Sequence, residues 1–72
     1  MSKEKLIKKL EEILEMEEGE LEETTVLEDV EEWDSLAKLS LIAFVKKEFS
    51  ISLTANQIKE FKTVADICNM LL

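Results

Sequence analysis

The sequence predicts an all-α fold, a small four-helix bundle of three main helices and one short helix. Hydrophobic residues recur at spacings of three and four along several stretches, as they do on one face of a helix. The chain has no proline and one glycine, whereas all-β folds use both freely at turns. Its 72 residues, 46% of them hydrophobic, suffice for one core and leave no room for a second. We therefore expect a single domain over residues 1–72.

The first helix is predicted from an apolar stripe near the start of the chain. Lysines and glutamates fill the positions between the apolar residues. Ser2 is suited to cap the first turn, and Gly19 is expected to stop the helix just beyond Met16. The stripe consists of Leu6, Ile7, Leu10, Ile13 and Leu14.

Residues 17–34 are predicted to form a long, ordered and acidic loop between the first two helices. Thr25 followed by Glu28 has the spacing of a capping box, which favours one short helical turn inside the loop. Long ordered loops are often functional. Four apolar residues are expected to anchor this loop to the core: Leu21, Val26, Leu27 and Val30.

The second helix is predicted to start at Ser35, after the N-cap Asp34, and to end at Glu48 or Phe49. Its apolar residues cover more than one face. One set is expected to face the core: Leu41, Ile42, Phe44, Val45 and Phe49. The other set, Leu36, Leu39 and Ala43, lies on a different side, so this helix is either covered on most sides or keeps an apolar surface for a partner.

A short third helix is predicted over Ala55–Glu60. Residues 50–53 form an extended connector before it. Thr54 with Gln57 makes a capping box at its start.

The last helix is predicted over Val64–Leu72. Thr63 with Asp66 resembles a second capping box at its start. Cys68 belongs to the apolar stripe of this helix, where a free thiol is a small core residue. The stripe is Val64, Ile67, Cys68 and Leu71.

The missing residue types argue against an enzyme. The chain has no histidine, which is the commonest general base and a frequent metal ligand. One cysteine forms neither an internal disulfide nor a zinc site, and the acidic stretch Glu28–Asp34 lacks the central glycine of a calcium-binding EF-hand loop. We predict no metal site. No apolar run approaches membrane-span length and the first residues are unlike a signal peptide, so we expect a soluble, cytoplasmic protein.

The negative charge is concentrated in one stretch of the chain. The net charge is -8, and residues 11–34 hold thirteen acids and no base. This acidity disfavours nucleic acid as a partner. It either directs a basic partner to residues 11–34 or serves to keep a small protein soluble.

Asp34-Ser35-Leu36 is the segment with a chemical signature. It places a serine hydroxyl at the first position of a helix, beside a carboxylate. The free N–H groups and the positive end of the helix dipole favour a phosphate there. Without histidine, Ser35 is no hydrolase nucleophile. The alternative is that Asp34 and Ser35 only cap the helix.

The order of elements resembles the acyl carrier proteins over nearly the whole chain. The family's Asp-Ser-Leu motif stands here as Asp34-Ser35-Leu36. Leu27-Glu28-Asp29 is similar to the family's loop element before the motif. Phe49 matches the phenylalanine that closes its second helix, and Thr63-Val64 matches the opening of its last helix.

The resemblance implies an acyl carrier domain over residues 1–72, an all-α bundle that is a monomer and not an enzyme. A phosphopantetheinyl transferase would attach 4′-phosphopantetheine from coenzyme A to Ser35, with Asp34 and Leu36 at the attachment site. The arm would hold acyl groups as thioesters for acyl-activating and acyl-transferring enzymes. Leu36, Leu39 and Ala43 would form the partner surface, unless Leu36 and Leu39 simply pack in the core.

The chain departs from the family pattern at two places. The second helix has Lys38, Lys46 and Lys47 where carriers of fatty acid synthesis are acidic. Trp33 before Asp34 is similar to stand-alone carriers with Trp-Asp-Ser-Leu that serve dedicated pathways, and we expect its ring to anchor the loop. We therefore expect a specialised pathway. Two alternatives stay open: an aminoacyl or peptidyl carrier, and an unmodified helical module that binds a basic partner through the acidic loop.

Overall fold

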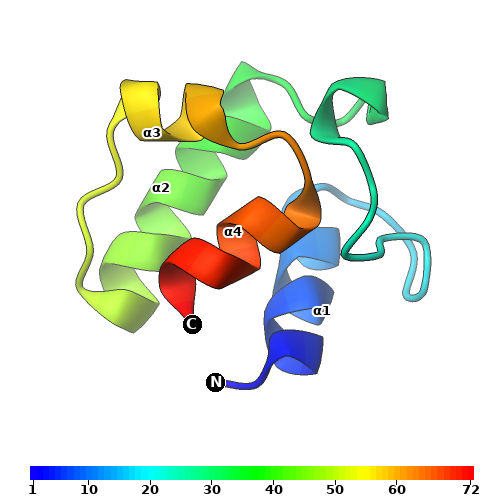
Figure 1. Cartoon of the computed structure of the whole chain (residues 1–72), viewed down its shortest axis with the longest axis horizontal. Helices are drawn as coiled ribbons and strands as arrows, with labels where there is room; N and C mark the ends of the chain where they lie inside the picture. Colours follow the sequence, from blue (N-terminus) through cyan, green and yellow to red (C-terminus); the bar gives the residue numbers. More distant parts are fainter.

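The computed structural model describes all residues 1–72 and contains four α-helices (Figure 1). They are α1 (Lys3–Ile13), α2 (Ser35–Phe49), α3 (Ala55–Glu60) and α4 (Val64–Leu71), and a 3-10 turn, η1 (Leu27–Asp29), lies between α1 and α2. This arrangement confirms the predicted bundle of three main helices and one short helix. None of the helices is both long and apolar enough to cross a membrane.

Helix α1 ends three residues earlier than the sequence predicted. Its start is as expected, since the backbone N–H of Lys5 donates to Ser2 Oγ at 3.2 Å. Its end is set by Glu15, which has a left-handed φ of 56°. The N–H of Met16 donates to Glu11 O at 2.8 Å, which is the Schellman arrangement. Gly19 therefore does not end the helix but lies further along the loop, with a φ of 92°.

The loop between α1 and α2 is ordered and includes one helical turn, as predicted. The predicted cap of that turn is wrong: Thr25 Oγ1 accepts a hydrogen bond from the N–H of Glu22 at 2.9 Å, and Val26 takes the N-cap position without a side-chain bond. The side chain of Val26 is also exposed rather than buried. Its backbone forms an isolated antiparallel bridge with Thr63, which ties the loop to the start of α4.

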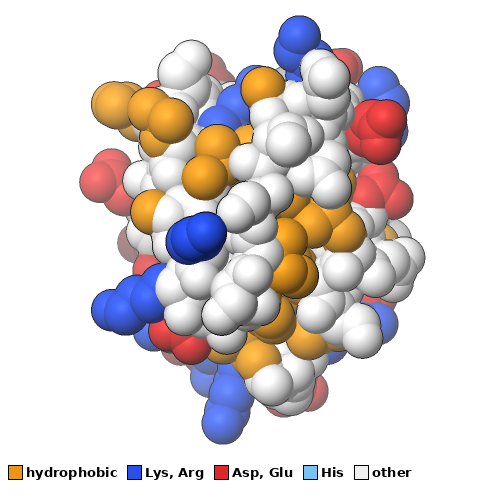
Figure 2. Space-filling model, turned by 90° about the vertical axis from the view of Figure 1, so that its left-hand side faces the viewer, with side chains coloured by type: hydrophobic (Ala, Val, Ile, Leu, Met, Phe, Trp, Pro, Cys, Tyr) orange, Lys and Arg blue, Asp and Glu red, His pale blue; other side chains and the backbone are white.

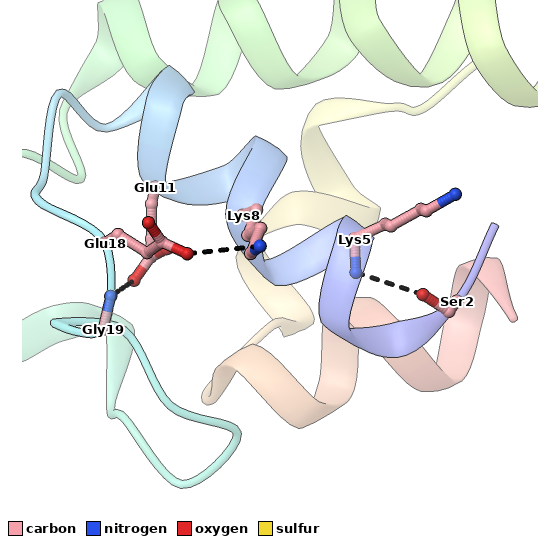
Figure 3. A network of polar contacts seen from close by, with 6 residues as sticks. All are labelled: Ser2, Lys5, Lys8, Glu11, Glu18 and Gly19. Carbon is pink, nitrogen blue, oxygen red and sulfur yellow. Dashed lines mark hydrogen bonds and ion pairs between the residues drawn. The ribbon is translucent and has the colours of Figure 1, made fainter.

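A buried glutamate on α1 holds the first part of the loop by hydrogen bonds. Glu11 is only 4% exposed, and its Oε2 accepts hydrogen bonds from the N–H of Gly19 at 2.8 Å and of Leu21 at 3.0 Å. Figure 3 shows the Glu11 carboxylate reaching from α1 to the loop at Gly19, next to the exposed ion pair of Lys8 with Glu18. The sequence counted Glu11 only as one of the thirteen acids of residues 11–34 and did not predict this structural role.

The core is formed by side chains from all four helices and the loop. On α2, the residues that face it are Ala37, Leu41 and Val45, while Ile42, Phe44 and Phe49 are half-buried at its edge. Cys68 is buried as predicted, and burial raises the pKa of its thiol. The buried apolar residues are Leu6, Leu10, Leu14, Leu21, Leu27, Val30, Ala37, Leu41, Val45, Leu53, Ile58, Phe61, Val64, Ile67 and Cys68.

The caps of the last two helices match the sequence. The N–H of Gln57 donates to Thr54 Oγ1 at 3.2 Å, and the N–H of Thr54 donates to Gln57 Oε1 at 2.9 Å. At α4, Asp66 Oδ2 accepts from the N–H of Lys62 at 2.8 Å and of Thr63 at 3.1 Å. These bonds from Lys62 and Thr63 lower the pKa of Asp66. The starts of α3 and α4 are therefore fixed by hydrogen bonds between residues close together in the sequence.

Candidate functional site

The start of α2 presents an exposed serine on a capped helix. Asp34 is the N-cap, and its Oδ1 accepts a hydrogen bond from the N–H of Ala37 at 2.9 Å. Ser35 follows as the first helical residue, and its side chain is exposed to solvent. Because α2 has 15 residues, the positive end of a substantial helix dipole lies beside this hydroxyl.

Trp33 holds the loop in place just before the serine. Its half-buried ring packs against the core, as the sequence predicted. The Nζ of Lys38 lies 5.7 Å from the centre of that ring, within the range of a cation–π contact. The position of Ser35 is therefore supported on one side by the Asp34 cap and on the other by a packed tryptophan.

The second apolar face of α2 is left open to solvent. Leu36 is 74% exposed and Leu39 is 62% exposed, and Ala43 is exposed as well. The alternative that Leu36 and Leu39 pack in the core is wrong. Two large hydrophobic side chains therefore lie uncovered within one turn of Ser35, which is the kind of surface that a partner protein covers.

A groove between α2 and α3 has Ser35 among its lining residues. It has a volume of about 300 Å³, and α3 lies beside the first turns of α2 (Figure 1). Figure 2 shows one face of the molecule, on which hydrophobic side chains reach the surface with both basic and acidic side chains around them. The groove is lined by Ser35, Lys38, Leu39, Ile42, Ala55, Ile58 and Lys59.

These features fit a phosphorylated arm on the serine. The hydroxyl is accessible, the helix start favours an anion on that oxygen, and the groove offers apolar walls for the rest of a flexible arm. The three predicted attachment-site residues lie at the start of α2. Asp34 is its N-cap, and Ser35 and Leu36 are its first two residues. It also adds Lys59 from α3, which the sequence did not connect with the site.

The comparison with protein families identifies the chain. The model of the phosphopantetheine attachment site family matches residues 4–71, which is nearly the whole chain. The chain belongs to this family. Domains of the family are non-catalytic carriers that hold 4′-phosphopantetheine covalently. No curated protein and no solved structure matches the chain significantly.

Membership of the family confirms the resemblance to acyl carrier proteins and the general role of a phosphopantetheine carrier. Such a carrier works with the enzymes that modify it and with biosynthetic enzymes. The attachment residue, the partner surface, the pathway, the monomeric state and the cytoplasmic location stay predictions.

Proposed function

We propose that residues 1–72 act as one carrier domain with its phosphopantetheine on the Oγ of Ser35. The observation that supports this proposal best is an exposed hydroxyl at the start of a capped 15-residue helix, beside an apolar groove. A transferase would join this oxygen to the pantetheine phosphate of coenzyme A. The phosphoanhydride bond breaks, 3′,5′-adenosine diphosphate leaves, and the hydroxyl proton passes to a base of the transferase.

The experiment that tests this proposal is an intact mass measurement. The purified chain is incubated with coenzyme A and a broad-specificity phosphopantetheinyl transferase. The expected result is a gain of one phosphopantetheine per chain. An unchanged mass, with the helical fold intact by circular dichroism, would favour the unmodified interaction module instead.

Asp34 is proposed to have two roles, as the cap of α2 and as a carboxylate that positions the transferase or its metal. Asp34→Asn keeps a good capping side chain and should unfold close to wild type, whereas Asp34→Ala should lose about 0.5–2 kcal/mol. If the negative charge helps loading, both variants load more slowly. Thermal unfolding and timed mass spectrometry measure the two effects separately. Loading of Asp34→Asn at the wild-type rate would leave Asp34 only the capping role.

The exposed face of Leu36, Leu39 and Ala43 is proposed as the partner surface. Replacing Leu36 and Leu39 with alanine should change the free energy of unfolding by less than about 0.5 kcal/mol, because both side chains are already exposed. The same double variant should lower kcat/KM of the transferase roughly tenfold, because a few side chains that become buried in the interface carry most of the binding energy. Leu72→Ala, which trims an exposed leucine that is not part of α2, is the control. Equal kcat/KM for all three proteins would rule out this surface for the transferase.

We also propose that the carrier serves a specialised pathway. Helix α2 has three lysines and one glutamate. Two of the lysines are in its second half, which is therefore basic rather than acidic. Lys46 and Lys47 follow the exposed apolar face on the same helix. Partners that dock along α2 would then present acidic groups opposite these lysines, and enzymes that select an acidic second helix would bind less well.

A further inference from the structure

The exposed apolar face of α2 separates two hollows that lie on opposite flanks of the helix. One is a hollow of about 190 Å³ between α2 and the end of α1. The other is the groove between α2 and α3, and the two share no residue. Because each helical residue turns the chain by about 100°, the α2 residues of the two hollows point in different directions. They are Leu36, Ala37 and Ser40 in the first hollow, and Ser35, Lys38, Leu39 and Ile42 in the groove.

The two hollows carry charges of opposite sign. The charged residues that line the hollow between α1 and α2 are three carboxylates, Glu15, Glu32 and Asp34. Those that line the groove are two lysines, Lys38 and Lys59. Acids and bases are thus sorted to the two flanks of one helix, in a chain whose net charge is -8.

The positive flank is not cancelled by the carboxylates near it. Glu28 lines an adjoining hollow together with Lys38 and Lys59, so two positive charges face one negative charge there. Glu60 follows Lys59 on α3 but lines none of these hollows. The Nζ of Lys38 is held 5.7 Å from the centre of the Trp33 ring, so part of this charge is in place before a partner binds.

Ser35 lies where the two flanks meet. Asp34 lines the acidic hollow, and Ser35 itself lines the groove. The two exposed leucines are divided in the same way, since Leu36 lines the acidic hollow and Leu39 lines the groove. An enzyme that reaches the Oγ of Ser35 and covers both leucines therefore comes against both charges.

Given attachment at Ser35, we propose that the phosphopantetheinyl transferase docks across α2 with a surface of two signs. A basic group of the transferase lies opposite Glu15 and Glu32. An acidic group lies opposite Lys38 and Lys59. The exposed leucines alone would allow the enzyme to sit on the helix in either direction, whereas opposite charges on the two flanks allow only one. The reversed direction is rejected because it brings like charges together.

The test reverses each flank and measures kcat/KM of the transferase encoded in the same genome as the chain. Glu15→Lys/Glu32→Lys should lower kcat/KM roughly tenfold, and so should Lys38→Glu/Lys59→Glu, because each change sets like charges opposite one another. Both changes in one chain keep the net charge at -8, since two acids become bases and two bases become acids. This chain should lose roughly a hundredfold. Circular dichroism checks the fold, and Lys59→Glu alone repeats the lysine reversal with Lys38 still over Trp33.

Two control pairs change the net charge by the same amounts at exposed residues that line neither flank. They are Glu17→Lys/Glu22→Lys and Lys5→Glu/Lys62→Glu. In 0.15 M salt, charges further from the interface than a Debye length of about 8 Å are largely screened. The control pairs should therefore change kcat/KM much less than the flank variants do.

The proposal fails if reversal of either flank raises kcat/KM, because the transferase surface would then have a single sign. It also fails if only one flank variant loses rate, if neither does, or if the control pairs lose as much as the flank variants. In each of these cases the wild-type chain still gains its phosphopantetheine, so the carrier function stands. A wild-type chain that gains none refutes both this proposal and attachment at Ser35.

Discussion

Ser35→Ala should abolish phosphopantetheine loading completely and leave the fold unchanged. The attachment needs a hydroxyl oxygen, and alanine supplies none. The cap of α2 comes from Asp34 rather than Ser35, and alanine is a good helix former, so the unfolding midpoint should stay near that of wild type. Intact mass after incubation with coenzyme A and the transferase measures loading, and circular dichroism measures the fold.

Ser40→Ala is the matched control for this experiment. Ser40 is an exposed serine on the same helix, but it lies in the interior of α2, away from the free N–H groups of the first turn. The control should gain one phosphopantetheine, as wild type does. If the Ser35→Ala variant still gains a phosphopantetheine, the arm is attached to another residue. That result would contradict the proposed site, although the chain would still be a phosphopantetheine carrier.

Glu11→Ala should destabilise the fold by about 2–4 kcal/mol. The Glu11 carboxylate is the acceptor for two backbone N–H groups, those of Gly19 and Leu21. Alanine leaves both donors without their partner, and the N–H of Leu21 is buried. A chain of 72 residues has a total stability of about 4–11 kcal/mol, so the loss is a large share of it. Urea unfolding followed by circular dichroism measures the change.

Glu12→Ala tests whether this effect belongs to Glu11 alone. Glu12 is exposed and pairs only with Lys9 on the surface, at 3.4 Å. Its loss should cost less than about 0.5 kcal/mol. Glu11→Gln retains one amide oxygen as an acceptor. Its loss of stability should therefore lie between those of Glu11→Ala and Glu12→Ala. Similar midpoints for Glu11→Ala and Glu12→Ala would show that the loop does not depend on the Glu11 hydrogen bonds.

Several parts of the site follow from short-range patterns in the sequence. Asp34 precedes an apolar helical stretch and caps α2 as predicted. Thr54 and Gln57 form the capping box of α3, and Asp66 accepts a hydrogen bond from the N–H of Thr63 at the start of α4. These caps are predictable because a capping side chain and the N–H groups it satisfies lie within four residues of each other. The same local rule misplaced the cap near Thr25, where the hydroxyl accepts from Glu22 instead of capping the turn that follows.

The sequence by itself determined the helices, their order and the serine that follows the Asp34 cap, because periodicity and capping act over a few residues. It could not choose between a buried and an exposed face for Leu36 and Leu39, since α2 has apolar residues on more than one side. Only the tertiary structure left that face open, buried Glu11 against the loop and brought Lys59 beside Lys38. Each of these outcomes depends on which residues from distant parts of the sequence become neighbours. Those neighbours are decided when the helices pack around their common core.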